Sequence, residues 1–205
     1  MRTDEDDWQA WRGGDQRAGE ALFERYFDAV YGFFHRRVAG DVGDLVQRTF
    51  LGCVEARDRF RGASTFRTFL FAIARNELCA HYRAAKRGAD IDFSVSSVAD
   101  LSPSPSAVAR ARSERERLVE ALRALPVDAQ VAIELRFWGG LSGPELAVVL
   151  EVAEGTVRSR LRRGLEGLRE HLARDGGGEI VEVAEGDDLE AWATRLGDHV
   201  RLDGE

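Results

Sequence analysis

Apolar residues recur every three or four positions along most of the chain, which is the spacing of a helix that buries one face. In the first half this pattern predicts four helices, over about residues 4–14, 17–38, 41–58 and 64–87. Four such helices are enough for one bundle, so residues 1–87 form the first predicted domain. Its expected core consists of Trp8, Trp11, Leu22, Phe23, Tyr26, Phe27, Val30, Tyr31, Phe34, Val38, Leu45, Val46, Phe50, Cys53, Val54, Phe66, Phe69, Leu70, Ile73 and Leu78.

Short polar side chains mark where several of these helices begin. Asp41 or Asp44 is expected to cap the third helix, and Ser64 the fourth. Farther along, Ser113 and Glu116 have the spacing of a capping box and predict a fifth helix from that point.

Residues 88–112 lose the helical period and gain Ser, Pro and Asp, so they are predicted to be a flexible linker. Beyond them, four more helical segments fill residues 113–174, and one of them runs from Asp128 to Trp138. The predicted fold class is therefore all-α, with two small helical domains joined by a linker. An acidic C-terminal extension follows at residues 175–205.

The last two helices of the second domain have the pattern of a helix-turn-helix over residues 141–172. Ser142 can cap a first helix of two turns, a turn follows at 151–153, and the second helix begins near Thr156. Its inner face is apolar and its outer face basic, which suits a DNA major groove. A solvated basic face on an ordinary helical hairpin is the alternative, but the short helix and the tight turn favour DNA binding. The outer face carries Arg158, Ser159, Arg162 and Arg163.

A net charge of −7 is unusual for a DNA-binding protein, but this charge is distributed unevenly along the chain. From Glu179 onward the chain contains nine acidic residues and only two basic ones, Arg195 and Arg201. This tail therefore carries the whole net charge of −7. Two basic segments lie before it: residues 57–87 contain eight basic and two acidic residues, and residues 155–174 contain six and two. Such segments are the electrostatic signature of nucleic-acid binding.

Several functional classes are disfavoured. No segment resembles a membrane span or a signal peptide, so a cytoplasmic protein without a membrane partner is expected. Cys53 and Cys79 lie in helical apolar patterns and are expected to be reduced core thiols. The four histidines show no metal-ligand or catalytic spacing, so we expect no enzyme activity, no metal and no cofactor.

Two segments together carry a resemblance to a known family. The sequence DVGDLVQRTFLGCVEARDRFRGASTFRTFLFAIARNEL, residues 41–78, resembles region 2 of bacterial sigma-70 factors, and EGTVRSRL, residues 154–161, is similar to their region 4. Both occur in the family's order across a Ser/Pro-rich linker, as in the two-domain extracytoplasmic-function (ECF) type. The resemblance covers roughly residues 8–172.

The resemblance implies three sets of functional residues. A polymerase-docking set would be Asp44, Gln47, Phe50 and Leu51, although Phe50 has core packing as an equal alternative. A minus-ten promoter set, which would melt DNA and hold a flipped base, would be Phe60, Arg61, Gly62, Ala63, Ser64 and Asn76; a solvated basic loop is the alternative. A minus-thirty-five set would be Thr156, Arg158, Ser159, Arg162 and Arg163.

The implied function is that of a sigma factor, which binds core RNA polymerase and directs it to promoter DNA. An anti-sigma factor is a further candidate partner, which the sequence does not identify. Three positions depart from the family pattern: Glu151 replaces a turn glycine, Arg48 replaces an acid, and Cys53 replaces an aromatic residue. Because Arg48 reverses charge on the docking surface, a DNA-binding regulator that does not dock on polymerase is the alternative function.

The extension beyond the family pattern is not plain low complexity. Residues 179–183 have strand composition, Asp187 could cap a helix containing Trp192, and residues 199–202 could be extended. One hypothesis is that this acidic segment folds back on the basic DNA-binding face and lowers promoter affinity. A solvated tail that aids solubility is the equal alternative.

Overall fold

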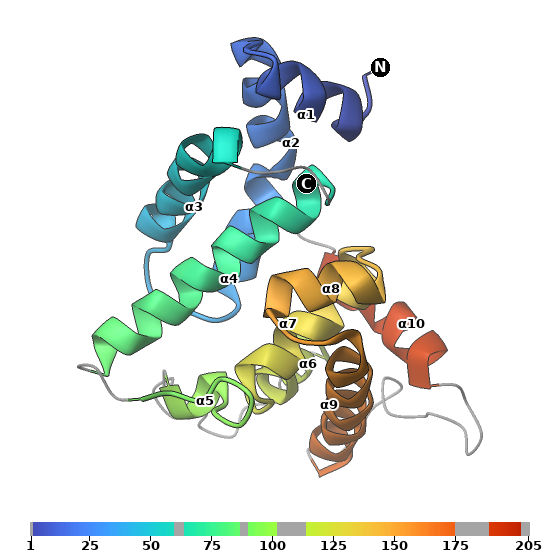
Figure 1. Cartoon of the computed structure of the whole chain (residues 1–205). Helices are drawn as coiled ribbons and strands as arrows, with labels where there is room; N and C mark the ends of the chain where they lie inside the picture. The colour runs from blue at the N-terminus through green and yellow to red at the C-terminus, as the bar shows by residue number, and fades with distance from the viewer. Residues whose placement is uncertain (1, 60–63, 87–89, 102–113, 175–188, 202–205) are drawn as a thin grey trace. The chain divides into compact units, whose positions relative to one another are not determined.

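The computed structural model describes residues 2–59, 64–86, 90–101, 114–174 and 189–201 of the chain. All regular elements in these ranges are helical, which confirms the all-α prediction. The chain divides into two compact units, Met1–Ala85 and Lys86–Glu205 (Figure 1).

The first unit contains four α-helices and a short 3-10 turn. They are α1 (Asp4–Arg12), α2 (Gln16–His35), α3 (Gly43–Ala56), η1 (Arg57–Arg59) and α4 (Phe66–Ala85).

Three helix starts are stabilised by side-chain caps. Thr3 and Asp6 form a capping box at α1, and Asp15 accepts a hydrogen bond from the N–H of Arg17 at α2. At α4 the capping hydroxyl belongs to Thr65, which accepts from the N–H of Thr68 at 3.3 Å, and not to the predicted Ser64.

An aromatic cluster joins α1, α2 and α4. Trp8 and Trp11 are 1% and 4% exposed, as predicted, and the ring centroids of both lie near that of Phe66, at 5.4 and 6.2 Å. Tyr26 of α2 approaches the same ring at 5.4 Å. Phe66 is therefore the ring on which the three helices converge.

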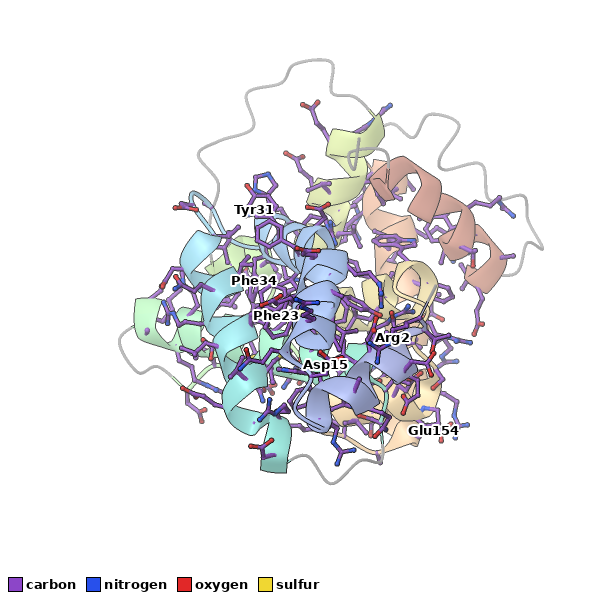
Figure 2. The ribbon with its side chains drawn as sticks, turned by 90° about the horizontal axis from the view of Figure 1, so that it is seen from above. Arg2, Asp15, Phe23, Tyr31, Phe34 and Glu154 are labelled. Atoms are coloured by element: carbon purple, nitrogen blue, oxygen red, sulfur yellow. The ribbon has the colours of Figure 1, made fainter. Side chains whose placement is uncertain are left out.

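A polar network ties α1 to the same helices. Arg25 bonds to the buried carboxylate of Asp7 at 2.8 Å and to Asp4, while the Tyr26 hydroxyl donates to Asp4 and accepts from Arg67 at 3.1 Å. Burial and then the hydrogen bond to Asp4 raise the pKa of Tyr26. At the edge of this network Arg2 approaches Asp15 at 3.4 Å (Figure 2).

The second unit is built around a long helix. Its elements are α5 (Val98–Leu101), α6 (Glu114–Arg123), α7 (Val127–Ile133), η2 (Glu134–Trp138), α8 (Gly143–Leu150), α9 (Glu154–Arg174) and α10 (Leu189–Arg201). Helices α7 and α8 both pack on α9 (Figure 1).

The single helix predicted for residues 128–138 is wrong in its second half. After α7 the chain widens into the π-helix η2, where the N–H of Gly139 donates to the carbonyl of Glu134 at 2.8 Å. A π-helix is rare and is often found at functional sites. The apolar spacing of three or four residues does not reveal the extra residue in that turn.

Residues 90–101 differ from the flexible linker predicted for 88–112. Three of their apolar side chains are buried in the second unit, and the carbonyl of Phe93 accepts a hydrogen bond from the N–H of Asp128 at 3.1 Å. The first N–H groups of a helix have no partner within that helix, so α7 gains an acceptor from this segment. The buried side chains are Ile91, Phe93 and Val98.

The predicted helix in the acidic extension is present as α10, but the extended piece expected at 199–202 is wrong because the helix continues to Arg201. The strand-like residues 179–183 and Asp187, like Ser113 in the second unit, lie outside the described residues.

The turn between α8 and α9 keeps the left-handed conformation that a glycine would favour. Glu151 has φ 55° and ψ 43° and ends α8, whose start carries the predicted capping box of Ser142 and Glu145. A non-glycine residue in this conformation costs roughly 1 kcal/mol.

We therefore expect Glu151→Gly to stabilise the second unit by about 1 kcal/mol because the strain is removed. Urea unfolding followed by circular dichroism measures the change. The control Glu151→Ala removes the same charge but keeps the strain, so it should show no gain. An equal gain for both variants would assign the effect to charge.

Candidate functional site

The outer face of α9 presents the predicted DNA-contacting residues together. Arg158, Ser159, Arg162 and Arg163 are all exposed, while Thr156 is half-buried in the first turn. On the opposite face Val157, Leu165, Leu168 and Leu172 are buried. The helix is thus anchored through its apolar stripe and offers its cations to solvent.

The arginines on this face make only weak interactions within the protein, which contacts with a ligand could replace. Arg158, with a side chain 75% exposed, meets Glu154 at 3.4 Å, and Arg163 donates to the carbonyl of Ser159 at 3.3 Å. Exposed ion pairs contribute little to stability, because solvent screens them. The guanidinium groups therefore remain available to phosphates and base edges.

A buried ion pair that the sequence did not reveal holds α9 in place. Arg160 meets Asp128 at 2.8 Å, with side chains only 14% and 5% exposed, and so links α9 to the start of α7. Close packing supports the link: a Cβ on Gly164 would lie 3.0 Å from Ile133 and 3.2 Å from Ala129. The sequence did contain one signal for this ion pair: among the arginines of this helix, Arg160 falls on the inward side.

The predicted docking residues gather on a groove between α2 and α3. The groove has a volume of about 750 Å³. Leu51 is 54% exposed there and Phe27, which was predicted to be core, is 49% exposed. The aromatic stripe of α2 is wider than the face that its neighbours cover, so Tyr31 is also exposed. The groove is lined by Phe23, Glu24, Phe27, Asp28, Gly43, Val46, Gln47, Phe50, Leu51 and Val54.

Phe50 is half-buried, packs against other aromatic rings and also lines the groove. Its ring lies 4.7 Å from that of Phe23 and 6.5 Å from that of Phe27. Sequence reasoning missed Phe23 and Phe27 as groove residues because both also fit a core pattern.

Asp44, the fourth predicted docking residue, lies outside the groove lining. Its carboxylate is 71% exposed and pairs with Arg48, which also donates to it through Nε at 3.0 Å. This hydrogen bond lowers the pKa of Asp44. The charge reversal at Arg48 is thus largely neutralised within α3.

The predicted minus-ten residues are only partly within the described chain. Phe60, Arg61, Gly62 and Ala63 lie outside it, while Ser64 is half-buried and precedes α4. Asn76 is exposed on α4, a helix that also carries Arg67, Arg75 and Arg83.

Comparison with known proteins shows the family to which the chain belongs. The family model "Sigma-70 region 2" matches residues 22–88, and "Sigma-70, region 4" matches residues 115–168. The ECF RNA polymerase sigma-E factor of Escherichia coli K12 is 34% identical over 165 residues, covering 76% of this chain and 86% of that protein. The chain belongs to the sigma-70 family. The sigma-E factor of Haemophilus influenzae is 33% identical, covering 75% of the chain and 86% of that protein.

Solved sigma factors have the same fold as this family member. RpoE of Bartonella quintana, in complex with the anti-sigma factor NepR, matches with 25% identity and a TM-score of 0.58, covering 76% of this chain and 97% of that one. CnrH, in complex with the cytosolic domain of CnrY, matches with 26% identity and the same TM-score, covering 84% and 98%.

Two further observations concern the described part of the chain. No helix in it is long and apolar enough to cross a membrane. Within the same residues, no three His, Cys, Asp or Glu side chains gather as a metal site would require.

Variants of Arg158 and Arg160 should distinguish a residue that contacts DNA from one that positions the helix. We expect Arg160→Ala to destabilise the second unit by about 3 kcal/mol because Asp128 loses its buried partner. Arg158→Ala should leave the urea midpoint unchanged but weaken promoter binding about tenfold. Urea unfolding and fluorescence anisotropy with promoter DNA measure the two effects. Loss of stability in Arg158→Ala would contradict this division.

Proposed function

We propose that this ECF-type sigma factor binds core RNA polymerase through the α2–α3 groove and promoter DNA through the outer face of α9. The observation that carries the proposal is that one chain of this family presents both surfaces, each on its own folded unit. The protein itself would catalyse no reaction and would act in the cytoplasm.

The groove has the character of a protein-docking surface. Its lining combines apolar side chains, of which Phe27, Leu51 and Val54 are about half exposed, with the polar side chains of Glu24, Asp28 and Gln47. An apolar centre with a polar rim is the usual construction of a protein interface. Leu51, at 54% exposed, would lose the most water on docking, so it should contribute strongly to affinity.

Promoter recognition would divide between the two units. Arg158, Arg162 and Arg163 would read the minus-thirty-five element, and the N-terminus of α9 near Thr156 would bind a phosphate. Residues 60–63, with Ser64 and Asn76, would open the minus-ten element and hold a flipped base. Both contacts place charge or stacking groups against DNA, so binding should weaken steeply with salt.

An anti-sigma factor is a further proposed partner. RpoE, whose fold matches this chain, was solved in complex with the anti-sigma factor NepR, and CnrH was solved in complex with the cytosolic domain of CnrY. The exposed groove of this chain offers such a regulator a surface that core polymerase would also use.

We expect Leu51→Asp to weaken binding of core RNA polymerase at least tenfold, because a carboxylate would be buried in the apolar groove. Gln47→Ala should weaken it less. Glu55→Ala, on the same helix but outside the groove lining, is the control. Pull-down of purified core polymerase and transcription from a cognate promoter measure the result.

The same experiment separates the two candidate functions. If the wild-type chain binds promoter DNA but no core polymerase, the protein is a DNA-binding regulator and the sigma-factor assignment fails. If it binds polymerase equally well in all variants, docking occurs elsewhere than in the groove.

A further inference from the structure

Helix α10 buries one of its faces in the second unit, although it lies outside the match to the region 4 family model, which ends at residue 168. Its inward face consists of Trp192, Ala193 and Leu196, which are 3%, 0% and 2% exposed. Burial of a tryptophan and a leucine contributes several kcal/mol. The helix is therefore specifically seated and not a solvated tail.

The seat is an apolar face to which α6, η2 and α9 contribute. Trp192 and its neighbours join one cluster with Leu118 and Leu122 of α6 and Leu172 of α9. The indole N–H of Trp138, in the π-helix, donates to the backbone carbonyl of Ala193 at 3.0 Å. This bond goes to the backbone, so any helix with a small residue at that point could accept it.

The seat is separate from the DNA-contacting face. Arg158, Arg162 and Arg163 remain exposed, so α10 does not cover them. The hypothesis that the acidic, Trp192-bearing segment folds back on the basic face is therefore wrong for α10, while residues 175–188 and 202–205 lie outside the described residues. The helix folds back, but onto apolar side chains.

We propose that this face of α6, η2 and α9 is a helix-docking site and that α10 is its resident occupant in cis. Three observations support the role of α10 as an occupant of this site. It lies beyond the residues that the region 4 family model matches, contacts chiefly η2 and α6, and lies against a π-helix. A partner that replaces it would present an amphipathic helix that, like α10, carries an aromatic residue, a small residue directly after it, and a leucine four positions after the aromatic residue.

The tether gives α10 an advantage over any external helix. Because α10 belongs to the same chain as the site, its binding is intramolecular and does not depend on the concentration of the protein. An external helix must therefore bind more tightly than α10 or bind when α10 has opened. The fraction of sites occupied by the partner would then rise with the concentration of that partner.

A peptide titration into the full-length chain tests the proposal without polymerase or promoter, so its result is independent of the proposed function. The probe is a fluorescent peptide of residues 186–205. We expect the Trp192→Ala chain to bind it at least tenfold more tightly than the wild type, because its own α10 no longer holds the site. Thr194→Ala, on the exposed side of α10, should behave as wild type. Equal binding by wild type and Trp192→Ala would overturn the proposal.

Hydrogen exchange of the wild-type chain gives a second test that needs no variant. If α10 is a displaceable occupant, its amides should exchange at least tenfold faster than those of residues 161–172 in α9. Equal protection of the two helices would show that α10 opens only with the whole unit. The docking proposal would then fail.

Discussion

The close contact between α7 and α9 is the constraint on which the second unit depends. Gly164 lets the helices approach, and the Asp128–Arg160 pair fixes the rotation of α9 about its own axis. With that rotation set, Arg158, Arg162 and Arg163 are exposed to solvent. One buried arginine therefore orients the exposed ones.

Local chemistry explains which parts of the fold were predictable. The capping box of Ser142 and the apolar stripe from Val157 to Leu172 act within a few residues, so the sequence alone located α8 and α9. The burial of Ile91, Phe93 and Val98 depends on contacts with distant helices, as does the π-helix. No short-range pattern reports such contacts, and for that reason the linker prediction was wrong for residues 90–101.

The candidate site divides in the same way. The arginines of α9 were found from helical spacing, whereas Gln47 and Leu51 were named only through family resemblance. Phe27 was assigned to the core because the sequence pattern of an aromatic stripe is the same whether or not a neighbouring helix covers it. Only the position of α3 decides that it lines a groove.

The α2–α3 groove also has a consequence for the free protein. Monomeric proteins rarely expose connected apolar surface, because such surface promotes self-association. With Phe27, Leu51 and Val54 about half exposed, the unbound chain carries this liability for as long as the groove is empty. The cell therefore gains by keeping the concentration of free protein low, through a bound partner or through rapid turnover.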